Sequence, residues 1–203
     1  LRQIFPAVVR FHVANRDVAH GALSAERVMF AANGRLMVME YALAAALDQL
    51  RLSQSRYWTE LRIAVPDSGP RFDQRADVTQ MALLAMALIL GRSLRDDEYP
   101  DRIGDVVAAA WAAVPAGGLE PLPPSLREWL VRALRLDSRN GFSTAAEATT
   151  AFEQAVAATD YPGAAASVER FLESYRRGEG LPATERSVEP AAGQSRFDDA
   201  VLS

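Results

Sequence analysis

The longest apolar run of the chain spans residues 78–90 (VTQMALLAMALIL) and is hydrophobic on nearly every face. A helix at a protein surface shows a single apolar stripe, so this pattern predicts a helix buried in the core. A membrane span is the alternative, but the run is shorter than the roughly 20 apolar residues that a bilayer requires, and polar residues precede it. Gly91 follows directly and suits the left-handed end of a helix.

The remaining pattern predicts further helices and one hairpin. Residues 27–30 and 36–40 read as two short strands around Ala32-Asn33-Gly34, because Asn and Gly both accept the positive φ of a tight turn. Helices are predicted at 4–15, 101–113, 125–136, 144–158 and 164–177, with linkers at 115–124 and 136–143 and an irregular stretch before the core helix. The predicted fold class is therefore mainly α (α+β).

Three parts are expected along the chain. Residues 1–158 would form one lobe, and residues 159–177 an additional helix that packs on the lobe or trails it. Residues 178–203 lose hydrophobic periodicity and become small, polar and charged, which is typical of a disordered tail or a linker. Leu1 falls inside a predicted helix, so the chain is expected to be a piece of a longer protein.

Composition narrows the classes of function. A chain of 203 residues without cysteine excludes disulfides and thiol catalysis, and with no secretory leader it predicts a cytoplasmic location. The net charge of -4 argues against nucleic acid as the main partner. All 22 basic residues are arginine, which excludes chemistry that needs a lysine ammonium within this chain.

Several short motifs follow one another in an unusual order. They are His20-Gly21-Ala22-Leu23-Ser24-Ala25-Glu26-Arg27, Glu40-Tyr41-Ala42, Val65-Pro66-Asp67, Arg75-Ala76-Asp77-Val78, Leu90-Gly91-Arg92 and residues 136–147 (LDSRNGFSTAAE). With these motifs, roughly residues 1–158 resemble the C-terminal lobe of a eukaryotic-like bacterial Ser/Thr protein kinase. The resemblance implies a kinase-like C-terminal lobe, helical with a small β-hairpin, whose N-terminal lobe is absent from this chain.

The positions that perform chemistry in that family depart from its pattern here. Phosphoryl transfer needs a carboxylate for the attacking hydroxyl, a lysine at the phosphate and two metal ligands. The resemblance places Ala22, Ser24, Arg27 and Glu40 there. A methyl group cannot take a proton, and loss of a general base typically costs about 10²–10⁴ in rate. Arg27 would bring a fixed cation to a magnesium position, and Glu40 is only a weak metal candidate, since it also suits a solvated surface.

Structural roles are implied for His20, Asp77 and Asp67. In the family, the residue at Asp77 accepts backbone hydrogen bonds from the catalytic loop, and His20 would anchor that loop to the hairpin. An ion pair at the position of Asp67 is expected to be lost, because its arginine partner has become Gly141; Arg139 is a candidate replacement. His12 is expected at the surface or partly buried.

Candidate phosphorylation sites lie in the stretch that corresponds to an activation segment. They are Ser53, Ser55 and Thr59, with Arg51, Arg56 and Arg62 nearby. Phosphates there could order a loop against the arginines. Solvated hydroxyls in a flexible loop are the simpler interpretation.

The sequence thus favours a catalytically inactive kinase-like (pseudokinase) domain that acts as a binding or scaffolding module in bacterial signalling. No cofactor is expected, although ATP binding without turnover is left open. The expected partners are proteins, either an active kinase or other domains of the parent chain, with no nucleic acid and no membrane contact. Two alternatives are a Ser/Thr kinase fragment that retains ATP binding or weak phosphotransfer, and an all-helical adaptor that lacks the hairpin.

Overall fold

A computed structural model describes residues 1–16, 18–31, 35–40, 43–66, 72–113, 118–137, 139–159, 173 and 175–177. The chain divides into two compact units, Leu1–Pro162 and Gly163–Ser203. In the second unit residues 173, 175 and 176 are helical, and the rest of the helix predicted at 164–177 and the tail predicted at 178–203 lie outside the described residues.

The first unit is mainly helical with two small antiparallel strand pairs, which confirms the predicted fold class. Its elements are α1 (Ile4–Ala14), a 3₁₀ turn (Ala25–Arg27), β1 (Val28–Phe30), β2 (Leu36–Val38), α2 (Ala44–Gln49), α3 (Gln54–Leu61), α4 (Gln74–Leu90), α5 (Ile103–Ala108), β3 (Trp111–Ala113), β4 (Leu119–Pro121), α6 (Pro124–Ala133) and α7 (Ala145–Ala157).

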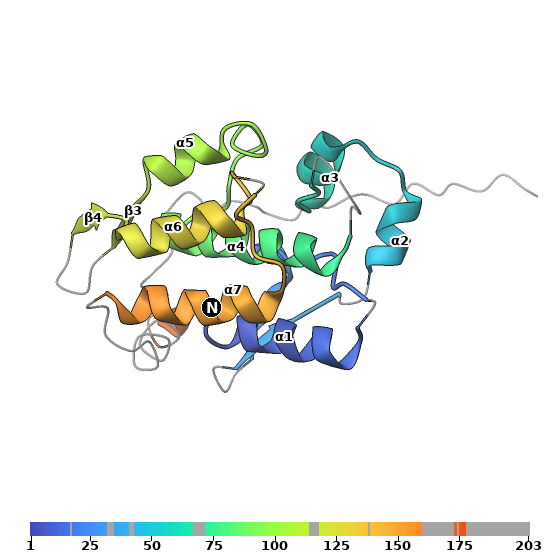
Figure 1. The fold of residues 1–203 in the computed structure, drawn as a ribbon, viewed down its shortest axis with the longest axis horizontal. Coiled ribbons are helices and arrows are strands. Elements are labelled where there is room, and N and C mark those ends of the chain that lie inside the picture. Colours follow the sequence, from blue (N-terminus) through green and yellow to red (C-terminus); the bar gives the residue numbers. More distant parts are fainter. Residues whose placement is uncertain are drawn as a thin grey trace, which may run out of the picture. The chain divides into compact units, whose positions relative to one another are not determined.

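Helix α4 is the core of this unit. Asp73 caps its N-terminus by accepting hydrogen bonds from the backbone N–H groups of Arg75 and Ala76, and Gly91 ends it at φ +64°. Every residue from Ala76 to Met86 is buried, and α6 and α7 pack against it (Figure 1). Within the described parts of the chain, no helix combines the length and apolarity needed to cross a bilayer. The run at 78–90 is therefore helical as predicted and buried as far as Met86, whereas Leu88 in its last turn is exposed.

Three aromatic rings join the helices around α4. Phe5 of α1 stacks on Trp129 of α6 at 5.6 Å between ring centroids, and both rings meet Phe152 of α7 edge-on at 4.9 and 5.2 Å. Edge-to-face and offset pairs of this kind add to the large apolar area that aromatic side chains bury. The aromatic cluster thus fixes α1 and α7, which are distant in sequence, on the same core.

The hairpin predicted after residue 27 is present. β1 pairs with β2 in antiparallel register, with Val28 opposite Val38 and Phe30 opposite Leu36. The turn predicted at 32–34 lies outside the described residues. An all-helical adaptor required this region to lack paired strands, so that alternative is wrong.

Two sequence predictions of secondary structure are also wrong. The helix predicted at 101–113 stops at the end of α5, and the next residues form β3, which pairs with β4 inside the predicted linker. Alanine-rich sequence favours a helix locally, but pairing with a later segment satisfies the same backbone groups as a strand. The stretch predicted as irregular contains α2 and α3, because Tyr57 and Trp58 become buried on one face of α3.

Candidate functional site

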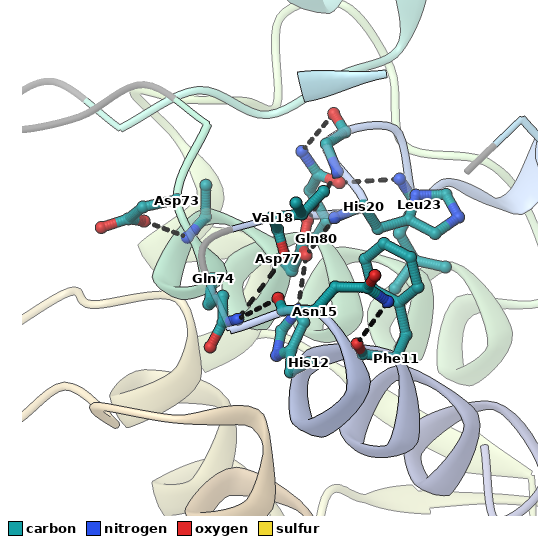
Figure 2. Close-up of polar contacts among 12 residues, drawn as sticks. Phe11, His12, Asn15, Val18, His20, Leu23, Asp73, Gln74, Asp77 and Gln80 are labelled. Carbon is teal, nitrogen blue, oxygen red and sulfur yellow. Dashed lines mark hydrogen bonds and ion pairs between the residues drawn. The ribbon is translucent and has the colours of Figure 1, made fainter. Parts of the chain in front are cut away.

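Asp77, in the first turn of α4, binds the backbone of the loop that follows α1. Its two carboxylate oxygens accept hydrogen bonds from the N–H groups of His20 (2.7 Å) and Gly21 (2.8 Å). His12 Nε2 of α1 lies 2.7 Å from the oxygen that His20 uses (Figure 2). The carboxylate is fully buried, and a helix N-terminus favours its negative charge. The backbone hydrogen bonds predicted for Asp77 are present.

Gln80 continues this attachment one turn further along α4. Its Oε1 accepts a hydrogen bond from the N–H of Leu23 (2.7 Å), and its Nε2 donates to the carbonyl oxygens of Gly21 (3.0 Å) and Ala64 (3.2 Å). The side chain is 1% exposed. Gln80 therefore joins the loop to the segment after α3, and its contact with Leu23 is drawn in Figure 2.

Sequence reasoning missed Gln80 and misplaced His12. A usable signal existed for Gln80, since an amide three residues after Asp77 shares its helix face, and buried amides have hydrogen-bond partners. His12 was expected at the surface or partly buried, but it is buried against Asp77. The approach of α1 to α4 causes that burial, and local sequence does not specify it.

The His20 side chain is buried and accepts a hydrogen bond. Its Nδ1 lies 3.2 Å from the backbone N of Ala22, which donates, so in the neutral ring the proton is on Nε2. Burial lowers the pKa of His20 below its usual value, and the nearby Asp77 carboxylate opposes that shift. The ring meets Phe11 of α1 edge-on, and the His20 carbonyl accepts from the N–H of Leu43. None of these described contacts of His20 is with β1 or β2. From the sequence, His20 was expected to anchor the loop to that hairpin.

Gly21 and Ala22 lie where α2 and α3 close over the loop. Gly21 has φ +80°, and a Cβ atom there would lie 2.7 Å from the backbone N and Cα of Ala44 in α2. Ala22 is fully buried in an apolar cluster whose other buried members are Leu47, Tyr57, Ile63 and Val65. We call this the α2–α3 cluster. The position where the resemblance expects a base is thus a methyl group packed on apolar side chains.

Arg27 joins two of the other departing positions, Ser24 and Glu40, into one polar cluster. Its Nε donates to Glu40 Oε2 at 2.6 Å, and its Nη1 donates to Ser24 Oγ at 2.9 Å and to the Leu61 carbonyl at 3.0 Å. The arginine side chain is 17% exposed, against 52% for Glu40. We call these residues the Arg27 cluster. The carboxylate that was a candidate metal ligand is therefore paired with a fixed cation.

Other sequence-derived candidates are placed only in part. Across the described residues, no three His, Asp or Glu side chains lie together as a metal-binding group would. Tyr41, Ala42 and Asp67 lie outside the described residues, so the pairing suggested for Asp67 with Arg139 does too. A small pocket beside the loop is lined mainly by apolar side chains, including Leu23.

Two of the three candidate phosphorylation sites lie in α3 and the third caps it, which corrects the prediction of an irregular loop. Ser53 caps the helix, because its hydroxyl accepts from the backbone N–H of Arg56 (3.3 Å), and it lies 3.0 Å from the Ser55 hydroxyl. The Thr59 hydroxyl donates to the Ser55 carbonyl (2.9 Å). All three side chains are exposed. A helix rather than a flexible loop presents them.

Two of the arginines near these hydroxyls already have carboxylate partners. Arg56 Nε lies 2.6 Å from Glu60 Oε1, one turn along α3. Arg62 Nη1 lies 2.5 Å from Asp96 Oδ1, and its guanidinium also lies over the Trp58 ring at 5.4 Å. A phosphate on α3 would compete with these pairs.

A second polar cluster fixes the turn after α4. The Glu98 side chain is 3% exposed and receives two hydrogen bonds from the Arg92 guanidinium, at 2.7 and 2.8 Å. The N–H of Arg95 donates a third, at 2.7 Å. The Arg92 hydrogen bonds, assisted by that backbone N–H and opposed by burial, hold the pKa of Glu98 at about 2. The turn after α4 is therefore held by a buried carboxylate that accepts from one guanidinium and one backbone N–H.

The region around the loop therefore combines a hydrogen-bonded framework with positions that are either apolar or paired with one another. Asp77 and Gln80 supply the framework, Ala22 is packed in the α2–α3 cluster, and Ser24 and Glu40 bind Arg27. No protein-family model matches the sequence, and no curated protein matches it.

Proposed function

We propose that residues 1–158 form a protein-kinase-like lobe that does not transfer phosphate and serves as a binding or scaffolding module in a bacterial signalling protein. The order of features supports this proposal: α1, the loop at His20, the β1–β2 hairpin, and a buried helix opened by Asp77. The hydrogen bonds from the loop to Asp77 are those that the resemblance requires.

The Arg27 cluster is the observation that carries the inactive part of the proposal. In an active lobe, a metal ion would be held between the positions of Arg27 and Glu40. Here the guanidinium bonds to Glu40 and to Ser24. Where the resemblance expects a metal ion, the lobe therefore carries a cation that does not deprotonate. A metal ion bound beside this guanidinium would be repelled, because like charges repel strongly at a partly buried site.

The burial of Ala22 supports the same conclusion at the position of the general base. A base must reach the hydroxyl whose proton it accepts, at about 2.6–3.2 Å or through one water. The Ala22 methyl is fully buried among apolar side chains of the α2–α3 cluster. Neither its chemistry nor its accessibility suits proton transfer.

Recognition of a protein partner is the role that remains for a folded lobe without these groups. The net charge of -4 disfavours a polyanionic partner such as nucleic acid. The rigid attachment of the loop through Asp77 and Gln80 supports a surface of fixed shape, which lowers the entropy cost of binding.

A radiometric phosphotransfer assay tests the proposal. The chain is incubated with γ-labelled ATP, magnesium and a general acceptor protein, beside an active Ser/Thr kinase as a positive control. We expect no label on the acceptor or on the chain itself above the level without protein. The matched variant is Glu40→Ala. Label that appears with the unaltered chain and disappears with this variant would contradict the proposal, whereas label that persists with both comes from a contaminating kinase.

Thermal unfolding distinguishes the pure scaffold from the alternative that retains nucleotide. The Tm of the chain is measured in buffer, with ATP alone and with ATP plus magnesium. A lobe whose metal position is filled by Arg27 has no metal-dependent rise in Tm, because a ligand stabilises a fold only by binding it. A rise that requires magnesium would favour the nucleotide-binding fragment instead.

A further inference from the structure

The β1–β2 hairpin has one face of methionines. Val28, Leu36 and Val38 point to the core and pack against it. The residues that alternate with them carry thioethers on the opposite side: Met29, Met37 and Met39 are 45%, 48% and 38% exposed. We call these three residues the methionine face.

The register of the hairpin places the three sulfur-bearing side chains together. Met29 and Met37 are directly opposite each other across the two strands. Met39 follows two residues after Met37, and its backbone N–H donates to the Arg27 carbonyl (2.9 Å), which extends the pairing. Because side chains alternate between the faces of a strand, all three project from the same side.

The outer face of a small antiparallel sheet is usually polar, since only the inner face packs on a core. Here that outer face consists of thioethers, the most easily oxidised side chains in a chain that has no cysteine. The other two methionines of the chain are different: Met81 and Met86 lie in α4 and are both 0% exposed. Of the five thioethers, three are therefore exposed to solvent and two are buried in the core.

We propose that the methionine face is a reversible oxidation site, at which a hydroperoxide converts the apolar outer surface of the hairpin into a polar one while the lobe stays folded. In each step the thioether sulfur supplies an electron pair to one peroxide oxygen. The O–O bond breaks, an S–O bond forms, and the hydroperoxide is reduced to the corresponding alcohol, or to water where it is hydrogen peroxide. In the reverse reaction the S–O bond breaks and the oxygen leaves as water, while two thiols of a reductase supply the electrons and protons and become a disulfide. This proposal does not depend on the proposed function.

The hairpin keeps its place because the oxidised atoms lie opposite its packed face. The strands are held on the core by Val28, Leu36 and Val38. In addition, the side chain of Gln3, the residue before α1, accepts a hydrogen bond from the N–H of Leu36 (3.0 Å). A sulfoxide is polar and disrupts the packing of a core in which the methionine is buried. Oxidation of Met81 or Met86 would have that effect, but their burial protects them.

Peptide mapping by mass spectrometry after treatment with hydrogen peroxide tests the assignment. In the folded chain we expect one added oxygen at each of Met29, Met37 and Met39, at least about tenfold faster than at Met81 and Met86, since susceptibility follows exposure. In urea all five should react at similar rates. Equal rates in the folded chain, or resistance of the three hairpin residues, would overturn the proposal.

Two further measurements test the change of surface and its reversal. The oxidised chain should keep its circular dichroism spectrum but elute earlier from a hydrophobic-interaction column. The control is the triple variant Met29→Leu, Met37→Leu and Met39→Leu, whose elution should not change after peroxide. Methionine sulfoxide reductases A and B with dithiothreitol should restore the original elution. Loss of the spectrum on oxidation, unchanged elution of the unaltered chain, or failure of both reductases would each contradict the proposal.

Discussion

Gly21 is the residue at which the loop comes nearest to α2, and it gives the sharpest single-residue prediction. We expect Gly21→Ala to lower the free energy of unfolding by about 3 kcal/mol, because the new Cβ would meet the Ala44 backbone in addition to the strain of positive φ. Urea unfolding followed by circular dichroism measures this. The matched control is Gly91→Ala, where φ is also positive but no atom lies within 4 Å; we expect about 1 kcal/mol there. Equal costs would show that the contact with Ala44 is unimportant.

Residues at the loop differ in how well the sequence predicted them. Asp77 could be predicted, because it follows the motif order of a known lobe and opens an apolar helix. Gln80 could have been predicted from its helix face, as an amide that burial obliges to find partners. His12 could not, since its partner is 65 positions away in sequence. A contact of that kind depends on how two helices approach, and hydrophobic periodicity does not encode it.

At the scale of elements, α2 and α3 make the Ala22 position apolar. We expect Ala22→Asp to lower the free energy of unfolding by about 3 kcal/mol or more, because a carboxylate would be buried without a partner. Ala45→Asp is the control, since Ala45 is exposed in the first turn of α2 and a change there stays within about 0.5 kcal/mol. Urea unfolding measures both variants. A fully stable Ala22→Asp chain would mean that the α2–α3 cluster opens easily.

The two wrong predictions of secondary structure had different causes. Helix α3 carried usable local signals, namely a Ser53 cap and apolar residues at 57, 58 and 61, but the resemblance to an activation segment suggested an irregular chain. Strand β3 carried no such signal, because its alanines favour a helix and its partner β4 lies inside the predicted linker. Pairing between distant segments outweighs local propensity, and this is where reasoning from short windows fails.

At the scale of the whole molecule, the core could be predicted well and the electrostatics poorly. The all-round apolar run identified α4, and the fold class followed from it. The arginines were counted, but their partners were not foreseen: Arg27 binds Glu40, Arg62 binds Asp96 and Arg92 binds Glu98. Charge pairing depends on the positions of side chains after folding, so composition alone could not locate these pairs.

The stability of the whole chain should depend on acid through Glu98. Its folded-state pKa is about 2, below the ordinary 4.5, so its contribution is fully present above about pH 4.5 and is lost as the pH falls towards 2. We expect Glu98→Gln to cost about 1–2 kcal/mol at pH 7 and progressively less below pH 4.5. Urea unfolding at several pH values measures this.

Glu60→Gln provides the comparison for the acid dependence. Glu60 also has a pKa lowered by an arginine hydrogen bond, from Arg56, but the pair is fully exposed on α3. Solvent screens such pairs, so the variant should follow the unaltered chain at every pH. A constant difference between the Glu98→Gln chain and the unaltered chain from pH 7 to pH 3 would contradict the role given to Glu98.

The attachment of residues 20–23 has a consequence for how long their amide protons survive in heavy water. Four successive N–H groups donate to buried side-chain atoms: two to Asp77, one to the His20 ring and one to Gln80. Irregular segments normally exchange these protons fast, whereas protons bonded to buried groups exchange only when the structure opens cooperatively. Hydrogen exchange should therefore find this loop as slow as α4 itself, and Asp77→Asn should shorten the lifetimes at His20 and Gly21 first. The segment would then be irregular in backbone conformation, yet its amide protons would exchange as slowly as those of a buried helix.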